Sequence, residues 1–259
     1  MVQPQLEEQA IDQPFSLFSI SEEPIPFETA QAQEKVLFKN GALPISKPGC
    51  FIWSMPQGLV VPKSARTNPD FDAAQKAMAD LGWPVDIRQT GGDLTPQAPG
   101  MINISYVFAQ PWSDAISIDA TYKALCAPII SYLKEKHDID AYCSAVDGAF
   151  CDGKFNIVVE GQKIAGTAQK WRHFKNETGQ KCIAVLGHVA LLGQLPLDQM
   201  INAANQFYKQ ANVDKTIELT NHTTLFHLIG EPNYNKSELM QGLLQSFREA
   251  APRGTTNSP

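Results

Sequence analysis

Two short apolar runs joined by a tight turn constrain the fold of this chain more than any other feature. The runs lie at residues 155–159 and 163–169, with Glu160-Gly161-Gln162 between them, and this arrangement predicts an antiparallel hairpin. Further strand-like runs lie at 50–53, 58–62, 84–93 (ending in a glycine turn), 101–108 and 181–192. Because hairpin-linked strands mix with helices, the pattern favours an α+β fold over a strict βαβ repeat.

Amphipathic spacing and helix-stop signals predict five helices between these strands. They run from Pro26 to a stop at Asn40-Gly41, over 70–83 with a stop at Gly82, over 114–136 with Pro128 as a candidate kink, over 195–208 and over 235–247. We therefore expect one domain over residues 21–250, preceded by a flexible N-terminal segment (1–20) and followed by a flexible tail (251–259).

Composition excludes several classes of function. The formal charge of −6, without a Lys/Arg run, argues against binding to a nucleic acid backbone. No apolar run reaches the length of a membrane span, and the first residues lack the pattern of a secretion signal, so we expect a cytoplasmic protein that does not bind a membrane. Five cysteines without a CxxC pair and five histidines without HExxH spacing suggest neither a disulfide framework nor a metal site.

The first candidate site is the segment Arg88-Gln89-Thr90-Gly91-Gly92. Adjacent glycines allow a ligand to approach the main chain, and Arg88 offers a forked cation beside them. A cradle for a small molecule is one interpretation, and an ordinary turn after a strand is the other.

The second candidate is Lys163, which begins the second strand of the predicted hairpin. The small residues Gly166 and Ala168 follow it and would leave a channel open beside the ammonium group. That ammonium could bind a carbonyl or a phosphate. The alternative is a solvated lysine next to a turn.

The third candidate is Cys151, twelve residues before Lys163. A thiolate near a cation is the nucleophile that can form an acyl thioester. A straight strand would hold Cys151 on the order of 25 Å from the hairpin turn. The two groups can meet only if the chain folds back, which Asp152-Gly153 permits, so we expect a mobile loop. The alternative is a buried structural cysteine, the interpretation given to the other four cysteines. His188 could likewise be a core residue or line a pocket.

The order and spacing of these segments resemble the lipoate-protein ligase, octanoyltransferase and biotin-ligase superfamily over roughly residues 28–230. Residues 88–105 resemble its Arg-x-x-Gly-Gly segment running into a Gly-x-x-Asn-x-Ser strand, and residues 155–172 resemble the signature that ends in Lys-Ile-x-Gly-x-Ala-Gln. The resemblance implies a catalytic domain of the biotin/lipoate protein ligase type, with mixed β-sheets flanked by helices.

The resemblance also assigns roles to residues. Lys163 would bind the acyl carbonyl, and Cys151 matches the cysteine of the branch that transfers octanoyl or lipoyl groups through a thioester. The residues expected to bind the acyl group are Arg88, Thr90, Gly91, Gly92, Asn103, Asn156, Gly166, Thr167 and Ala168.

The implied function is transfer of an octanoyl or lipoyl group, without a cofactor, to the lysine of a lipoyl domain. The donor would be an acyl carrier protein or an acylated lipoyl-domain protein. The acceptor would be the lipoyl domain of a dehydrogenase complex or a glycine cleavage protein.

Two alternatives remain: an ATP-dependent lipoate-protein ligase and a non-catalytic protein that binds acyl groups or lipoyl domains. Asp93 and Thr95-Pro96-Gln97 stand where the ligases usually carry a third glycine and a His-Asp pair. The chain also ends about thirty residues after the resemblance, leaving no room for an accessory C-terminal domain. Both departures favour transfer.

Overall fold

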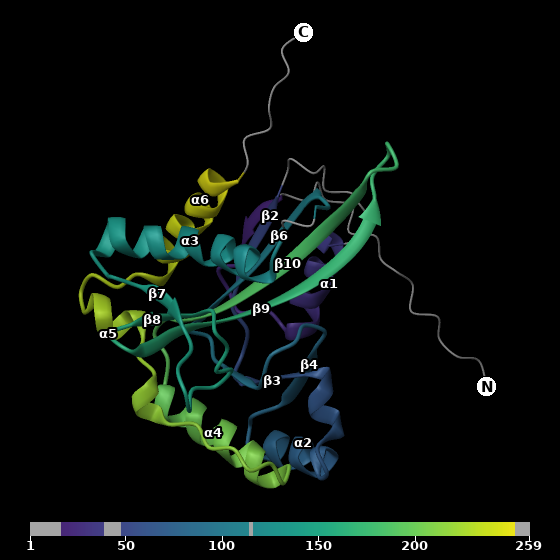
Figure 1. The fold of residues 1–259 in the computed structure, drawn as a ribbon. Coiled ribbons are helices and arrows are strands. Elements are labelled where there is room, and N and C mark those ends of the chain that lie inside the picture. The colour runs from purple at the N-terminus through teal and green to yellow at the C-terminus, as the bar shows by residue number, and fades with distance from the viewer. Residues whose placement is uncertain (1–16, 39–47, 114–115, 252–259) are drawn as a thin grey trace, which may run out of the picture.

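The structure, a computed structural model, describes residues 17–38, 48–113 and 116–251. Its main element is a seven-stranded mixed sheet with the strand order β1-β2-β6-β10-β9-β8-β7 (Figure 1). The strands are β1 (Phe18–Ile20), β2 (Gly49–Trp53), β6 (Met101–Pro111), β7 (Tyr142–Ser144), β8 (Asn156–Val159), β9 (Gln162–Lys175) and β10 (Lys181–Leu192). A three-stranded sheet, in the order β4-β3-β5, contains β3 (Gly58–Pro62), β4 (Val85–Arg88) and β5 (Thr95–Gln97).

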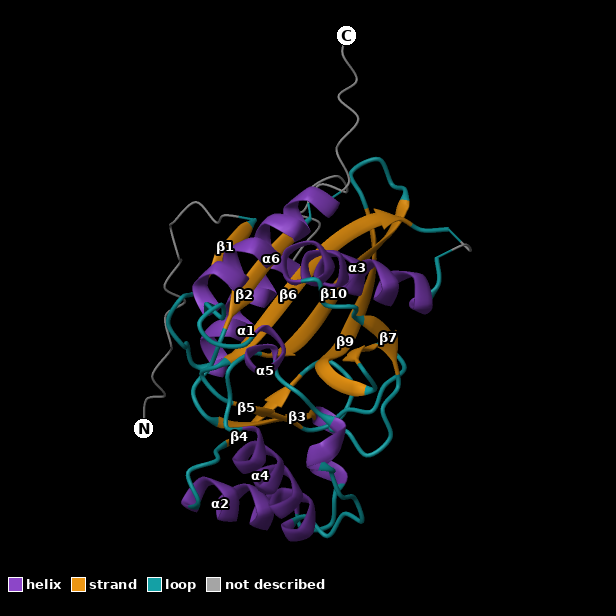
Figure 2. Cartoon of the chain, turned by 90° about the vertical axis from the view of Figure 1, so that its left-hand side faces the viewer, coloured by secondary structure: helices purple, strands orange, loops and turns teal. Residues whose placement is uncertain are grey.

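Helices cover both sheets, as Figure 2 shows. The helices α3 (Ile118–His137) and α6 (Lys236–Ala250) pack on one face of the large sheet, and α1 (Phe27–Phe38) packs on the opposite face. The helices α2 (Phe71–Asp80) and α4 (Leu197–Gln210) form a second core with the small sheet. Short helical segments lie at Lys63–Thr67, Leu219–Asn221 and Leu225–Ile229, the last being α5.

The register of the three central strands determines which residues share a face. Three consecutive rows cross β6, β10 and β9 on one face: Asn103–Ala190–Gly166, then Ser105–His188–Ala168, then Val107–Leu186–Lys170. Gly187 points to the other face, where a Cβ on it would lie 2.9 Å from the Leu125 side chain of α3. The three rows therefore face α1, and the two cavities described below lie over them.

The predicted α+β class is confirmed, because mixed sheets are flanked by helices, and the hairpin forms as expected. Several boundaries differ. Residues 18–20, assigned above to a flexible segment, form β1 and pair in parallel with β2. This pairing is a tertiary contact, which the sequence of a three-residue strand does not predict. β9 continues to Lys175 because β10 pairs with residues 165–175 of it. The helix expected from residue 114 begins at Ile118, capped by Ser117, and continues through Pro128.

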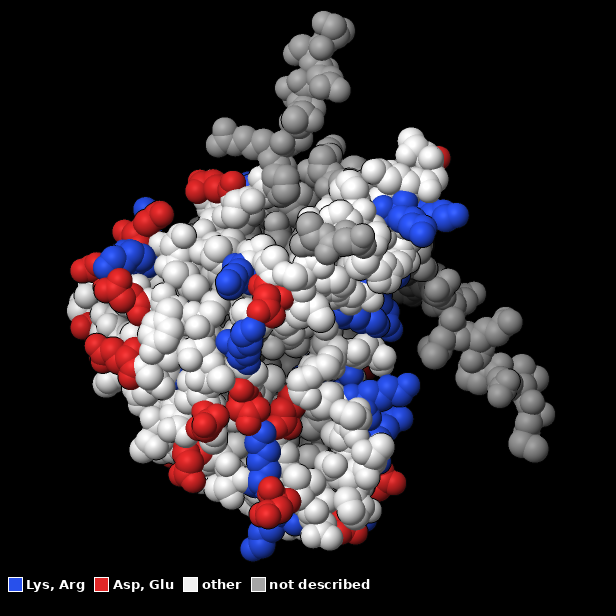
Figure 3. Space-filling view, viewed as in Figure 1, with Lys and Arg blue, Asp and Glu red and all other residues white. Residues whose placement is uncertain are grey.

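Some predictions fall on residues outside the described ranges: the helix stop at Asn40-Gly41, and the greater part of both predicted flexible ends, at 1–16 and 252–259. No helix in the described ranges combines the length and the hydrophobicity that crossing a bilayer requires. Figure 3 shows that basic side chains gather on the right of this view, where β9 and β10 extend, and acidic ones toward the left and lower parts.

Candidate active site

The first cavity lies between the row-bearing face of the large sheet, the small sheet and α1. It holds about 550 Å³ of empty space, part of it open to solvent, which is the size range of small-molecule sites. Its walls are mostly apolar or small residues, with polar side chains at intervals. The lining residues used below are Glu34, Arg88, Asn103, Cys151, Gly166 and His188.

Cys151 lines the first cavity from a loop that folds back before β8. Its φ of +51° is in the left-handed region that few residues other than glycine adopt. Asn156 donates to the carbonyl of Gly153 at 3.2 Å, which closes the turn that follows. A Cβ placed on Gly92 would lie 3.1 Å from Cys151 Sγ and 2.9 Å from Arg88 Nη2. The thiol and the guanidinium group therefore both adjoin the backbone of Gly92.

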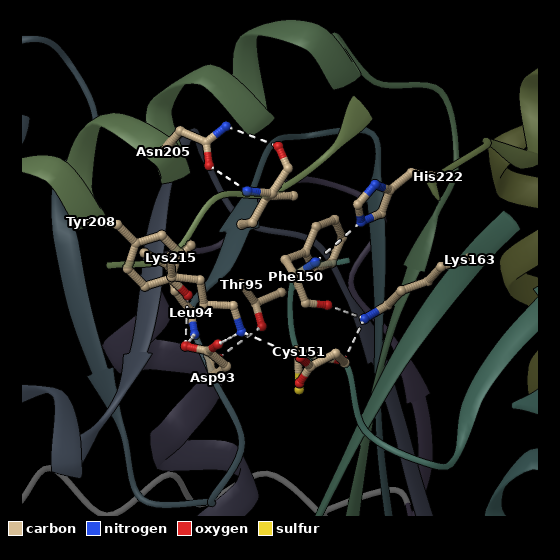
Figure 4. A network of polar contacts seen from close by, with 12 residues as sticks. Asp93, Leu94, Thr95, Phe150, Cys151, Lys163, Asn205, Tyr208, Lys215 and His222 are labelled. Carbon is tan, nitrogen blue, oxygen red and sulfur yellow. Dashed lines mark hydrogen bonds and ion pairs between the residues drawn. The ribbon is translucent and has the colours of Figure 1, made fainter. Parts of the chain in front are cut away.

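Lys163 is fully buried, and its ammonium group binds the Cys151 loop through the main chain (Figure 4). Nζ donates to the carbonyl of Phe150 and, at 2.9 Å, to the carbonyl of Cys151. It also lies 4.5 Å from the centre of the Phe150 ring. Burial lowers the pKa of Lys163 to about 8, although Cys151, Asp152 and Asp93 oppose that shift. The fold-back that the sequence analysis required therefore brings the Cys151 backbone to Lys163.

Gly166 separates Lys163 from the first cavity. A Cβ on Gly166 would lie 3.1 Å from Lys163 Nζ and 3.4 Å from Cε. An ammonium group carries three donors, and the two loop carbonyls take two of them. Because Gly166 lines the first cavity and has no side chain, Nζ lies directly beneath the cavity wall at this point.

His222 supports the same loop, and the sequence analysis missed it. Its Nε2 accepts a hydrogen bond from the Phe150 N–H at 3.3 Å, while its Nδ1 lies 2.9 Å from the carbonyl of Glu218. Nδ1 is therefore the protonated nitrogen of a neutral ring. Burial and the neighbouring charge of Lys163 lower the pKa of His222 to about 4. The ring also stacks on Phe150 at 4.5 Å. His222 is thus a neutral, fixed support for the Cys151 loop.

Arg88 organises the glycine segment rather than standing free. It donates to the carbonyls of Val60 at 3.0 Å, Gly91 at 3.1 Å and Asp93 at 2.5 Å. These bonds turn the segment around the guanidinium group, which remains part of the cavity wall. A buried cation therefore faces the cavity beside Cys151.

Asp93 joins the glycine segment to α4 and to the Cys151 loop. Its carboxylate accepts from Tyr208 at 2.7 Å and from Lys215, and Lys215 lies 3.7 Å from Asp152. Burial alone would raise the pKa of Asp93, but the hydrogen bonds from Lys215 and Tyr208 hold it below its usual value. Asp93, which departs from the ligase pattern, is thus an ionised residue at the edge of the site and connects the glycine segment to α4 and the Cys151 loop (Figure 4).

A second polar group lies at the other side of the first cavity, and the sequence analysis missed one of its members, Glu34. Glu34 of α1 accepts from Ser105 Oγ at 2.5 Å and lies 2.8 Å from His188 Nε2. Thr90 Oγ1 lies 3.3 Å from His188 Nδ1. Burial would raise the pKa of Glu34, but His188 and Ser105 keep it lowered. His188 therefore lines the cavity with polar partners, rather than standing among apolar core residues.

Of the residues expected at the acyl site, Arg88, Asn103, Gly166, Thr167 and Ala168 line the first cavity with Cys151. The others lie behind this wall or beside it. Gly92 adjoins Cys151 Sγ, Gly91 accepts from Arg88, Thr90 contacts His188, and the buried Asn156 lies below Gly166. In the described part of the chain, no three His, Cys, Asp or Glu side chains cluster as a metal site requires.

Comparison with known proteins places these features in context. The family model of the lipoyl protein ligase A/B catalytic domain matches residues 26–248. An uncharacterised protein of Cupriavidus necator is 34% identical over 164 residues, which are 60% of this chain and 64% of that protein. An octanoyl-[GcvH]:protein N-octanoyltransferase of Kyrpidia tusciae is 33% identical over 150 residues, which are 58% of this chain and 51% of that enzyme. The matches thus span between about half and two thirds of these relatives.

Among solved structures, a T. acidophilum protein assigned as a lipoate protein ligase, with bound lipoic acid, is similar to this chain. The TM-score is 0.64 at 17% sequence identity, over 89% of this chain and 83% of that one. At this level of identity the likeness concerns the fold.

Proposed function

We propose that this chain, which belongs to the lipoyl protein ligase A/B catalytic domain family, transfers an octanoyl or lipoyl group onto the lysine of a lipoyl-domain protein through a thioester on Cys151. The observation that carries the proposal is the position of Cys151, whose thiol lines the first cavity while its backbone is bound by Lys163. The relatives named as octanoyl-[GcvH]:protein N-octanoyltransferases support the same type of transfer.

The first step is attack of the Cys151 thiolate on the acyl carbonyl. A bond forms between Sγ and the acyl carbon, the bond from that carbon to the sulfur or nitrogen of the donor protein breaks, and the leaving group takes a proton. Lys163 and Arg88 place two buried positive charges beside the Cys151 loop, which favours a developing oxyanion.

The second step is attack of the acceptor lysine on the thioester. An amide bond forms, the Cys151 sulfur leaves, and the proton lost by the amine restores the thiol. The acyl group enters already bound to the donor protein, either as a thioester, which is activated, or as an amide, which is exchanged for another amide, so the reaction consumes no ATP. The donor is an acyl carrier protein or an acylated lipoyl-domain protein such as GcvH. The names of the relatives give octanoyl-[GcvH] as their donor.

The experiment combines the chain with an octanoylated carrier protein and an unmodified lipoyl domain, with and without ATP, and follows all proteins by intact mass. We expect octanoyl transfer without ATP, and an octanoyl adduct on Cys151. Cys151→Ser should lose transfer. Cys143→Ser is the matched control, because Cys143 lies on β7, and it should retain transfer. Transfer that needs ATP and survives Cys151→Ser would contradict the proposal and indicate a ligase.

A further inference from the structure

A second cavity lies next to the first on the same face of the large sheet. It holds about 450 Å³ of empty space, part of it open to solvent, and its floor is formed by Leu186 and Lys170. These two residues are the row that follows Ser105–His188–Ala168 along the strands. The two cavities are therefore consecutive along one strand direction.

Glu34, His188 and Arg88 line both cavities, so they stand between them. Glu34 comes from α1 and His188 from β10, and their side chains meet at 2.8 Å with exposures of only 10% and 21%. Thr90 contacts the free ring nitrogen of His188, and Ser105 contacts Glu34. We call the Glu34–His188 pair the polar partition.

The reactive end of the first cavity lies on the side away from the second cavity. Lys163 Nζ adjoins Gly166, and Gly166 is one row before Ala168 and His188. Two residues along a strand cover about 7 Å. Cys151 lines the first cavity and not the second. A chain attached at Cys151 and extending along the floor thus reaches the polar partition before it reaches Leu186.

We propose that the polar partition limits the length of the acyl chain that this protein accepts to that of an octanoyl-sized group. The inference rests on the proposed function and adds which acyl groups the site takes. An apolar chain cannot pass between a carboxylate and its imidazole partner without stripping a buried polar pair of its hydrogen bonds, which is costly. Without the pair, the two cavities join beside Arg88. The apolar surface of the added space comes from Leu186, Phe38 and the aliphatic part of Lys170, and its polar lining comes from Gln31, Lys35, Gln89 and Thr90.

The test is a comparison of acyl-chain preference between the wild type and Glu34→Ala/His188→Ala. Both partners are replaced because removal of one would leave the other buried and unpaired. The first readout is calorimetric binding of free octanoate, dodecanoate and tetradecanoate. The second is the rate of adduct formation on Cys151 from the matching acyl donors. We expect the wild type to prefer octanoate over dodecanoate by at least about tenfold.

In the double variant, dodecanoate should gain about fourfold in affinity for each further methylene that enters the second cavity. Leu186→Ala is the matched control, because it enlarges the second cavity but leaves the polar partition intact, and it should keep the wild-type preference. His188→Gln retains a hydrogen-bonding side chain of similar size opposite Glu34 and should also keep it.

Two results would overturn the inference. One is the finding that the wild type binds dodecanoate as tightly as octanoate. This measurement does not depend on the folding of any variant. The other is a double variant that melts cooperatively and still shows the wild-type preference. Failure of the proposed function looks different: no acyl donor would label Cys151, whereas the fatty-acid preference in the binding assay needs no reactive thiol and would still be present.

Discussion

Replacing Lys163 with methionine removes a fully buried ammonium group at nearly constant volume, and its effect on stability should depend on pH in a defined direction. The pKa of Lys163 falls from 10.5 in the unfolded chain to about 8 in the fold because of burial. Below the lower value both states are protonated, and the full cost of the buried charge is present. Above the higher value both states are neutral, and that cost has gone.

The magnitude follows from the two pKa values. Between them the unfolded state binds more protons, so the free energy of unfolding of the wild type rises with pH. A shift from 10.5 to about 8 corresponds to about 3 kcal/mol in total, of which about 2 kcal/mol is gained by ~pH 9.5. Lys163→Met has no such group. The difference in unfolding free energy, wild type minus variant, should therefore rise by about 2 kcal/mol from ~pH 7 to ~pH 9.5.

The assay is urea unfolding of both proteins at a series of pH values. Lys134→Met is the control, because Asp138 and Asp140 raise rather than lower the pKa of the exposed Lys134. The difference in unfolding free energy between the wild type and Lys134→Met should therefore not rise from ~pH 7 to ~pH 9.5. A pH-independent difference between wild type and Lys163→Met would refute the account of a charged, desolvated lysine.

Three further variants test single contacts of the site. Gly166→Ala would place a methyl group 3.1 Å from Lys163 Nζ, so single-turnover acyl transfer should fall about 10–100-fold while the melting temperature changes little; unchanged transfer would show that this gap is not used. Tyr208→Phe removes a 2.7 Å hydrogen bond to the ionised Asp93 and should cost about 1.5–3 kcal/mol in urea unfolding near neutral pH. The cost should shrink in acid as the carboxylate is protonated, and an equal loss at all pH values would contradict this. His222 has a folded pKa of about 4 against 6.5 in the unfolded chain, so the wild type should lose about 3 kcal/mol of stability as the pH falls through that window. His222→Gln should lack that loss, and parallel pH profiles for the two proteins would argue against a buried neutral ring.

The parts of the site that the sequence predicted are those encoded by local patterns. The hairpin and the small residues after Lys163 are contiguous, so periodicity and turn chemistry were enough to place Lys163, Gly166 and Ala168 on one strand. The fold-back at Cys151 followed from chain geometry, since a straight strand cannot return to Lys163. The predicted acyl-binding roles of these residues stay predictions.

The parts that sequence reasoning missed depend on contacts between distant segments. Glu34 is 71 positions from Ser105, and Thr90 is 98 positions from His188. Glu34 lies on a helix where a carboxylate ordinarily faces solvent, so only the packing of α1 against the sheet reveals its partners. His222 was invisible for the same reason: it reaches Phe150 from a segment 72 positions away. A histidine isolated in the sequence was the only available signal.

The most direct test of the central claim is a chase of the isolated acyl-enzyme. The protein is first incubated with an octanoyl donor, freed from that donor, and shown by peptide mass spectrometry to carry the octanoyl group on Cys151. An unmodified lipoyl domain is then added without ATP, and both proteins are weighed over time. The account predicts that the adduct disappears from Cys151 at the rate at which the octanoyl amide appears on the lipoyl domain. An adduct that persists while the domain remains unmodified would contradict it.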